Sequence, residues 1–372
     1  MAKQAAIMFA AIVLTTIGSA AHAAETDQFL TWEVVLADST GPLNTYLNEQ
    51  AHAFLENVNN FAAPIETAEA LTIRFYEYLF QGLHSSRIRT FVNTDPHIDR
   101  YPNREVSFLE YQRMSIYRKP AFPYILPMAR TVRIGNVYLG TDKIGHFFGF
   151  GRRYFQRFLR HRDEERRDPE AAMRKVVQWG IAIERSLVGG LVDGIFSYAD
   201  LEANFQGFQM ALDCAEGDNP YFQKAGGKWV LTSPFDLRDY ITPGFDESYN
   251  VNHYQGLRKR QVLPILEREY CKLRDSGIVQ RRFGRYELHE PSFSQQVIKA
   301  HYDEKDTAPQ EEQSLHNLCP QHQQTATRPF GGPLGILAHK TKRRETGAPV
   351  QTDEHMLPLL DVNPHPIVPI LK

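Results

Sequence analysis

The chain has 372 residues, and 42 Lys and Arg against 44 Asp and Glu give it a formal net charge of −2. A nucleic-acid-binding protein usually carries a basic excess, so this balance predicts no nucleic-acid partner. With 42% hydrophobic and 12% aromatic residues, the composition is typical of a globular protein with a sizeable core. It excludes collagen-like, wholly disordered and multi-span membrane classes for the chain as a whole.

The first 23 residues have the pattern of a secretory signal peptide. Lys3 gives a positive start, residues 5–14 form an apolar run, and Ala21-His22-Ala23 matches a small-x-small cleavage site. A membrane anchor is the alternative, but the run is shorter than the roughly 20 residues of a spanning helix. We therefore predict cleavage after Ala23 and a periplasmic or secreted protein. It is not expected to be a lipoprotein, because no cysteine precedes Cys214.

Apolar residues at spacings of three and four predict a mainly α fold, a helical bundle with long irregular loops. Helices are expected over residues 42–61, 65–83, 141–159, 169–191, 198–212 and 254–273, the last bent at Pro264. Residues 132–139 fit a short strand or an extended loop. The segment 213–256 looks irregular and aromatic, and 84–140 is mixed and rich in turn signals. We predict one helical domain over 24–300 and, over 301–372, a low-complexity tail that is disordered.

The chain has three cysteines, Cys214, Cys271 and Cys319. An odd number in an exported protein means that at least one is unpaired or pairs between chains. Cys214 and Cys271 fall in the part that is expected to fold, whereas Cys319 falls in the tail. We therefore expect a disulfide between Cys214 and Cys271. No pair has the spacing of a structural zinc site.

Polar residues on three consecutive predicted helices, within 140–212, form the candidate site. Asp142 and His146 are four apart, and so are Asp200 and Asn204, so each pair shares a helix face. Glu184 lies within an apolar stripe, where a carboxylate is costly unless it is paired or bound to a cation. Inward-facing Asp, Glu and His on facing helices are how bundle metal sites are built. Asp142, His146, Glu184 and Asp200 are therefore candidate ligands of a divalent metal.

The same groups could instead form an acid/base site, in which a carboxylate tunes His146. His146, Asp142, Lys143 and Glu184 are then the candidate catalytic residues, with Lys143 and Arg152 neutralising an anionic substrate. Small side chains on the last helix, beginning with Gly207, suit close helix packing, and Asn204 could bond a neighbouring helix carbonyl.

Purely structural explanations exist for each of these residues. Asp142 follows the predicted N-cap Thr141, where the helix dipole favours an acid. His146 on its own is more often a satisfied core histidine, Glu184 could be half of a buried ion pair, and Asp200 could be a cap. Asp246, Glu247 and His253 could add a second site, but a surface position is favoured for them. The basic run at 340–344 could touch anionic lipid, although a solvated charge run is favoured.

This pattern resembles that of VanZ-like and YfiM-type bacterial envelope proteins. The resemblance covers about residues 140–212 and consists of Asp142-Lys143-x-x-His146-Phe147, then Glu184, then Asp200-x-x-x-Asn204-x-x-Gly207. It implies a functional unit of the cell envelope without supplying a reaction. The chain departs from the first group in lacking helices of span length, and from the second in lacking the lipid-bearing cysteine.

Two classes of function follow. The first is a non-catalytic envelope factor that binds a lipid, glycan or protein partner through the aromatic segment 221–254, with peripheral membrane contact as one option. The second is a metal- or acid/base-dependent, hydrolase-like envelope enzyme that acts on a lipid or glycan through Asp142, His146, Glu184 and Asp200. The sequence does not indicate an oligomeric state.

Overall fold

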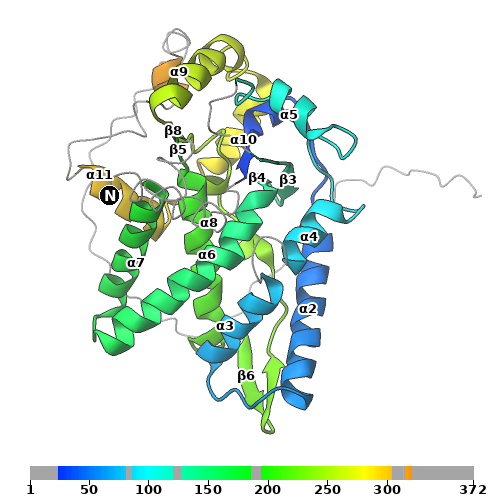
Figure 1. Cartoon of the computed structure of the whole chain (residues 1–372), viewed down its shortest axis with the longest axis vertical. Helices are drawn as coiled ribbons and strands as arrows, with labels where there is room; N and C mark the ends of the chain where they lie inside the picture. Colours follow the sequence, from blue (N-terminus) through cyan, green and yellow to red (C-terminus); the bar gives the residue numbers. More distant parts are fainter. Residues whose placement is uncertain are drawn as a thin grey trace, which may run out of the picture. The chain divides into compact units, whose positions relative to one another are not determined.

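Helices dominate the part of the chain that the computed structural model describes, which is residues 24–80, 86–119, 127–185, 194–303, 313 and 315–319. All of these described residues belong to one compact unit. The predicted signal peptide, residues 1–23, lies outside the described residues, and so does the predicted tail beyond residue 319. The mainly α class is confirmed (Figure 1).

The α-helices are α2 (Thr40–Asn60), α3 (Ala68–Leu79), α4 (Arg87–Thr94), α5 (Phe108–Met114), α6 (Thr141–Leu159), α7 (Pro169–Ile183), α8 (Tyr198–Ala215), α9 (Gly256–Ile265), α10 (Gly277–Tyr286), α11 (Phe293–Asp303) and α13 (Leu315–Leu318). Short 3-10 or π-helical turns are η1 (Gln28–Thr31), η2 (Arg160–Glu164), η4 (Leu237–Asp239), η5 (Pro243–Phe245) and η6 (Leu266–Tyr270). None of the helices in the described residues is both long and apolar enough to cross a membrane.

The strands of the described residues pair two by two and form no larger sheet. Parallel β1 (Glu25–Thr26) and β2 (Met128–Ala129) join the N-terminal segment to the body. Antiparallel pairs are β3 (Thr131–Ile134) with β4 (Val137–Gly140), β5 (Ile195–Phe196) with β8 (His253–Tyr254), and β6 (Phe222–Ala225) with β7 (Lys228–Leu231). The segment 132–139 is therefore a hairpin.

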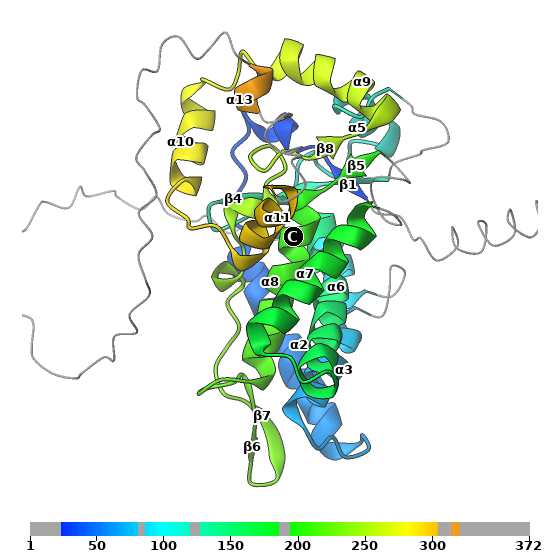
Figure 2. The same ribbon diagram turned by 90° about the vertical axis from the view of Figure 1, so that its left-hand side faces the viewer.

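The main core lies between α2, α3, α6, α7 and α8, and it corresponds to the helices that periodicity predicts. The contact between α6 and α8 is the most extensive. At Gly207 of α8, an added Cβ would lie 1.9 Å from the carbonyl oxygen of Phe147 in α6, and at Gly151 it would lie 2.7 Å from Gly207. The two helices therefore cross where neither has a side chain. Figures 1 and 2 show this group of helices between the β6–β7 hairpin at one end and α9 at the other.

A second core packs the N-terminal segment against the chain after residue 250. Its buried members include Phe29, Trp32, Ile195, Tyr254 and Tyr270. Trp32 is wholly buried, with the ring of Tyr270 edge-on at 5.6 Å. This core contains η6, which follows α9, so the long helix predicted over 254–273 changes form just after Pro264.

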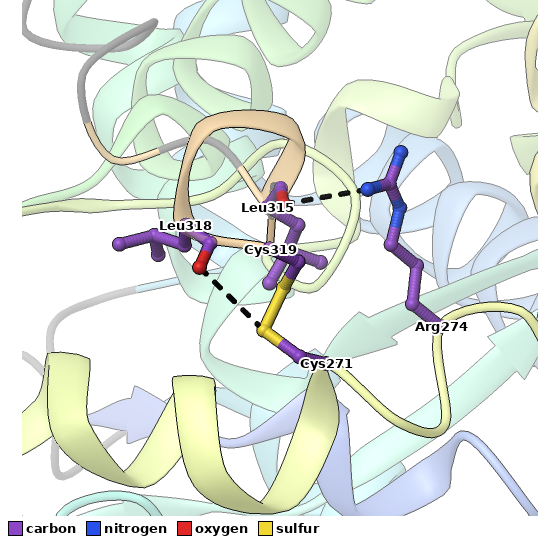
Figure 3. Close-up of a disulfide and its surroundings, with 5 residues drawn as sticks. All are labelled: Cys271, Arg274, Leu315, Leu318 and Cys319. Atoms are coloured by element: carbon purple, nitrogen blue, oxygen red, sulfur yellow. Dashed lines mark hydrogen bonds between the residues drawn. A yellow bond between two sulfur atoms is a disulfide. The ribbon is translucent and has the colours of Figure 1, made fainter. Parts of the chain in front are cut away.

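The predicted disulfide is wrong. Cys271 pairs with Cys319, with their Cα atoms 5.5 Å apart, and Cys214 is a free, buried thiol in α8 (Figure 3). The reason is that Cys271 belongs to the second core, whereas Cys214 lies in the main core. Beside the disulfide, the Arg274 guanidinium lies 3.5 Å from the carbonyl oxygen of Leu315.

The residues that follow 300 include packed ones, so the predicted boundary at 300 falls inside α11. The side chain of Gln313 is buried and bonds both backbone groups of Tyr254: its Oε1 accepts from the N–H at 2.8 Å, and its Nε2 donates to the carbonyl at 3.0 Å. The Gln313 side chain thereby bonds the backbone of β8 as a neighbouring strand would.

The aromatic segment 221–254, which the sequence suggests as a binding surface, is largely packed into the protein. Most of its large side chains are buried, including Trp229, Phe235 and Tyr240. Trp229 Nε1 donates to the carbonyl of Ile65 at 2.9 Å, and Phe235 stacks on Phe75 with ring centroids 5.7 Å apart. Apolar rings in an irregular segment are stabilised by burial, and here they complete the main core.

Candidate functional site

Asp142 and Lys143 lie in the first turn of α6, which directly follows the β3–β4 hairpin. Gly140 is the last residue of β4 and the N-cap of α6. An added Cβ at Gly140 would lie 1.9 Å from Thr26 Oγ1 and 2.1 Å from Asp142 Oδ1. The missing side chain leaves room for the Thr26 hydroxyl to donate to Asp142 Oδ1 at 2.6 Å.

Ser197 arranges the second part of the site as the N-cap of α8. Its Oγ accepts from the backbone N–H of Asp200 at 3.1 Å, which places Asp200 in the first turn. Its own N–H donates to Glu184 Oε1 at 3.0 Å, so Glu184 ties the end of α7 to the start of α8. Glu184 is buried, as its place in an apolar stripe predicts.

Lys143 lies at the centre of the site, with a side chain that has no exposed surface. Its Nζ is 2.7 Å from Asp142 Oδ2, 2.5 Å from Asp200 Oδ1 and 2.5 Å from Glu247 Oε1. An ammonium group has three N–H donors, so three carboxylates use all of them. We call Asp142, Lys143, Asp200 and Glu247 the carboxylate cluster.

Glu247 was assigned to the surface, and the structure corrects this. Both Asp246 and Glu247 are buried directly after η5. The backbone N–H of Glu247 donates to Gln28 Oε1 at 2.9 Å, and its Oε1 lies 3.4 Å from Ser197 Oγ. The acidic pair follows the wholly buried Phe245, and that apolar neighbour within an aromatic segment was the available signal.

His146 borders the cluster one helical turn after Asp142, on the predicted shared face. Its Nε2 is 3.3 Å from Asp200 Oδ2, and its Nδ1 is 3.1 Å from Asn204 Oδ1. The residue is 8% exposed, which makes it the least buried residue at this site. Its ring stacks on Phe150, with the centroids 5.3 Å apart. Both ring nitrogens therefore face oxygen atoms of α8.

The remaining predicted residues lie elsewhere. Arg152 pairs with Glu77 of α3 at 2.7 Å, away from Lys143. Gly207 lies at the crossing of α6 and α8. Glu184 is linked to the cluster through Ser197. The structure thus brings the predicted Asp142, Lys143, His146 and Asp200 together with Glu247, for which the sequence favours a surface position.

Burial and neighbouring charge act against each other in the cluster. Burial lowers the pKa of Lys143, but the carboxylates of Asp142, Asp200 and Glu247 outweigh it and hold the pKa well above its usual value. Burial raises the pKa of Asp200, yet His146 and Lys143 hold it below its usual value. For Glu247 burial dominates, and with the charges of Asp142 and Asp200 it raises the pKa to about 8 against the opposing effect of Lys143. The neighbouring carboxylates thus favour the charged form of Lys143, whereas burial favours the neutral form of Glu247.

One oxygen each from Asp142, Asp200 and Glu247 could hold a metal ion, because these atoms lie within 4.8 Å of one another. Carboxylate oxygens suit hard cations such as Mg²⁺, Ca²⁺ or Mn²⁺. The Nζ of Lys143 bonds one oxygen of each of the same three groups. A cation bound by all three oxygens would therefore compete with the lysine for them.

A shallow hollow of about 420 Å³ lies apart from the cluster, between α2 and α4. Its lining includes Tyr46 and Phe91, whose rings stack with the centroids 3.9 Å apart, and Arg87.

No protein-family model matches the chain, and neither a curated protein nor a solved structure matches it. The resemblance to VanZ-like and YfiM-type proteins therefore stays a prediction.

Proposed function

We propose that the protein is an exported, non-catalytic factor of the bacterial cell envelope, in which the carboxylate cluster is a structural network. The observation that carries the proposal is the full use of Lys143: its three donors meet three carboxylates, and its side chain is wholly buried. A lysine in this state has no donor left for a phosphate or carboxylate of a substrate.

The positions of the bonded groups support this role. Thr26 comes from β1, Lys143 from α6, Asp200 from α8 and Glu247 from the loop after η5. Segments that lie far apart in sequence, from residue 26 to residue 247, thus meet at one charged centre. Because an unpaired buried charge is strongly destabilising, the network favours this single arrangement of the segments.

A second function is a cation-dependent envelope enzyme, and one observation favours it. Glu247 Oε2 is buried, and it has no hydrogen-bond partner within the described residues. At the site where Asp142, Asp200 and Glu247 could hold a metal ion, this oxygen offers a hard divalent cation a ligand atom that accepts no hydrogen bond from the described residues. Such a cation would act as a Lewis acid on an ester or phosphate of the substrate.

Metal content separates the two functions. The mature full-length chain is purified from a periplasm without chelator or affinity-tag metal, because Gln313 and Cys319 show that a fragment ending at 300 would lack packed residues. The structural network predicts no stoichiometric divalent metal and the same unfolding temperature with and without EDTA. One equivalent of metal per chain, lost in Asp200→Asn with the fold retained, would contradict the network and support the enzyme.

A further inference from the structure

Basic residues are concentrated in one stretch near the end of the described part. Residues 256–288 contain nine Lys and Arg against four Asp and Glu, a net charge of +5. Since the whole chain carries −2, the rest carries −7. The stretch contains α9, η6 and α10, and both Figures 1 and 2 show α9 and α10 at the end of the molecule opposite the β6–β7 hairpin.

The inner face of α10 is fixed to the body. Val279 is buried in the second core. The Arg282 guanidinium donates to the carbonyl of Thr31 at 2.6 Å, and the hydroxyl of Tyr286 donates to Asp246 Oδ2 at 3.1 Å. These three residues, at spacings of three and four, hold α10 in a defined orientation.

The outer face of α10 combines apolar and cationic side chains. Ile278, Arg281, Arg285 and, just beyond the helix, Leu288 follow the same spacing of three and four and are all exposed. Ile278 is 37% exposed and Leu288 is 83% exposed. Within the described chain neither arginine pairs with a carboxylate: Arg285 contacts only the amide oxygen of Asn136, at 3.4 Å. Exposed apolar groups beside unpaired arginines are unusual for a face that contacts only water.

We infer that this outer face of α10 is a contact surface for an anionic phospholipid membrane. Guanidinium groups bind phosphate in a bidentate way, and leucine and isoleucine side chains enter the boundary between headgroups and acyl chains. In α9, Leu257 and Arg260 repeat the combination of an exposed apolar and an exposed basic side chain. The chain's own residues 320–372 carry six Lys and Arg against four Asp and Glu, so charge disfavours them as the occupant.

The inference goes beyond the proposed function because it uses no residue of the carboxylate cluster. It rests on that function only in placing the protein in the envelope, where it can meet phospholipid. A failure of membrane binding leaves the structural network untouched, and a metal in the cluster would leave the membrane surface untouched.

The test is sedimentation of the mature full-length protein with phosphatidylcholine vesicles that do or do not contain phosphatidylglycerol. We expect binding to the anionic vesicles only, reversed by about 0.5 M salt, which reduces the screening length to a few ångströms. The variant R281Q/R285Q should bind about 30-fold more weakly, at about fivefold for each arginine. Leu288→Gln should weaken binding by about tenfold.

Two matched variants control for charge and hydrophobicity. K175Q/K228Q removes the same charge from exposed lysines of α7 and β7, and Phe61→Gln removes a side chain that is 81% exposed at the end of α2. Both should bind like the unmodified protein. The inference is overturned if R281Q/R285Q binds as well as K175Q/K228Q, if neutral vesicles bind equally, or if no vesicle binds. Binding to an acidic polypeptide without binding to vesicles would also overturn it and indicate a protein partner.

Discussion

The two hydrophobic cores of the molecule are assembled in different ways. The main core is built by long helices, such as α2 and α6, whose apolar stripes face one another. The second core is built from short pieces: η1, one residue of β5, the turn η6 and the disulfide to Cys319. Local periodicity is enough to specify the first, whereas the second depends on contacts between residues far apart in the chain.

The carboxylate cluster lies where these cores meet. Ile195 belongs to the second core, Phe196 to the main core, and Ser197 follows them into the cluster. Likewise, Phe245 packs in the main core and Val251 in the second, with Glu247 between them. A charged network at this junction couples the stability of one core to that of the other.

The largest expected effect is that of Lys143→Met, which removes the cation of the cluster between the two cores. It leaves buried Asp142 and Asp200 without their cation, so we expect the free energy of unfolding to fall by about 3–5 kcal/mol. Chemical denaturation measures it. The double variant K143M/D200N should regain part of the loss, because it removes one orphaned charge, whereas exposed Lys175→Met should change stability by less than about 0.5 kcal/mol. Equal effects of Lys143→Met and Lys175→Met would refute the network.

Cys319→Ser affects the second core alone. Opening the disulfide should lower the free energy of unfolding by about 2–4 kcal/mol, and a reductant should bring the unmodified protein to the same value. Protection from hydrogen exchange should fall first around η6 and Tyr254. Cys214→Ala keeps the Cys271–Cys319 disulfide, so reductant should still lower the stability of this variant. If reductant had no effect on it, the disulfide would instead join Cys214 to Cys271.

Gly207→Ala affects the main core alone. The new methyl group would overlap the carbonyl oxygen of Phe147, so α6 and α8 must separate, at a cost of about 1–3 kcal/mol. Gly41→Ala is the control, since nothing lies within 4 Å of a Cβ at that position in α2. It should stabilise the protein slightly. A thermal unfolding series in which both variants behave alike would show that the close crossing does not exist.

Glu247→Gln is measured as a change in the slope of stability against pH, which is at most about 1 kcal/mol per pH unit. The folded state raises the pKa of Glu247 from its usual 4.5 to about 8, so between these values the unfolded chain loses the proton before the folded one does. Stability should therefore fall as the pH rises through this window, by up to about 1 kcal/mol per pH unit. Asp27, with a pKa that burial raises to about 7, acts in the same direction. The permanently neutral glutamine should flatten the profile; an unchanged slope would contradict the assignment.

The sequence predicts the main core well and the second core poorly. The helices α2, α3, α6 and α8 repeat apolar residues over several turns, and Asp168-Pro169 gives the start of α7 directly, with Asp168 as its cap. The short α4, α5, α10 and α11 were not predicted, because seven to eleven residues show too little periodicity.

The candidate site was predicted in part for a related reason. Asp142, His146, Asp200 and Asn204 share helix faces, so their spacing reveals them. Glu247 comes from a loop, which has no period, and its partner Gln28 is 219 residues away. The sequence pattern also does not predict the full burial of Lys143, since a lysine in the first turn of a helix ordinarily reaches solvent.

The state of the Lys143 ammonium tests the structural network most directly. The signal of its ε-carbon can be followed by NMR in ¹³C-lysine-labelled protein, assigned with Lys143→Arg, across pH and during addition of Mg²⁺, Ca²⁺ and Mn²⁺. The network predicts that Lys143 stays charged well above the usual lysine pKa of 10.5 and that none of the cations changes its signal. A pKa at or below 10.5, or a stoichiometric change on adding one of the metals, would contradict it.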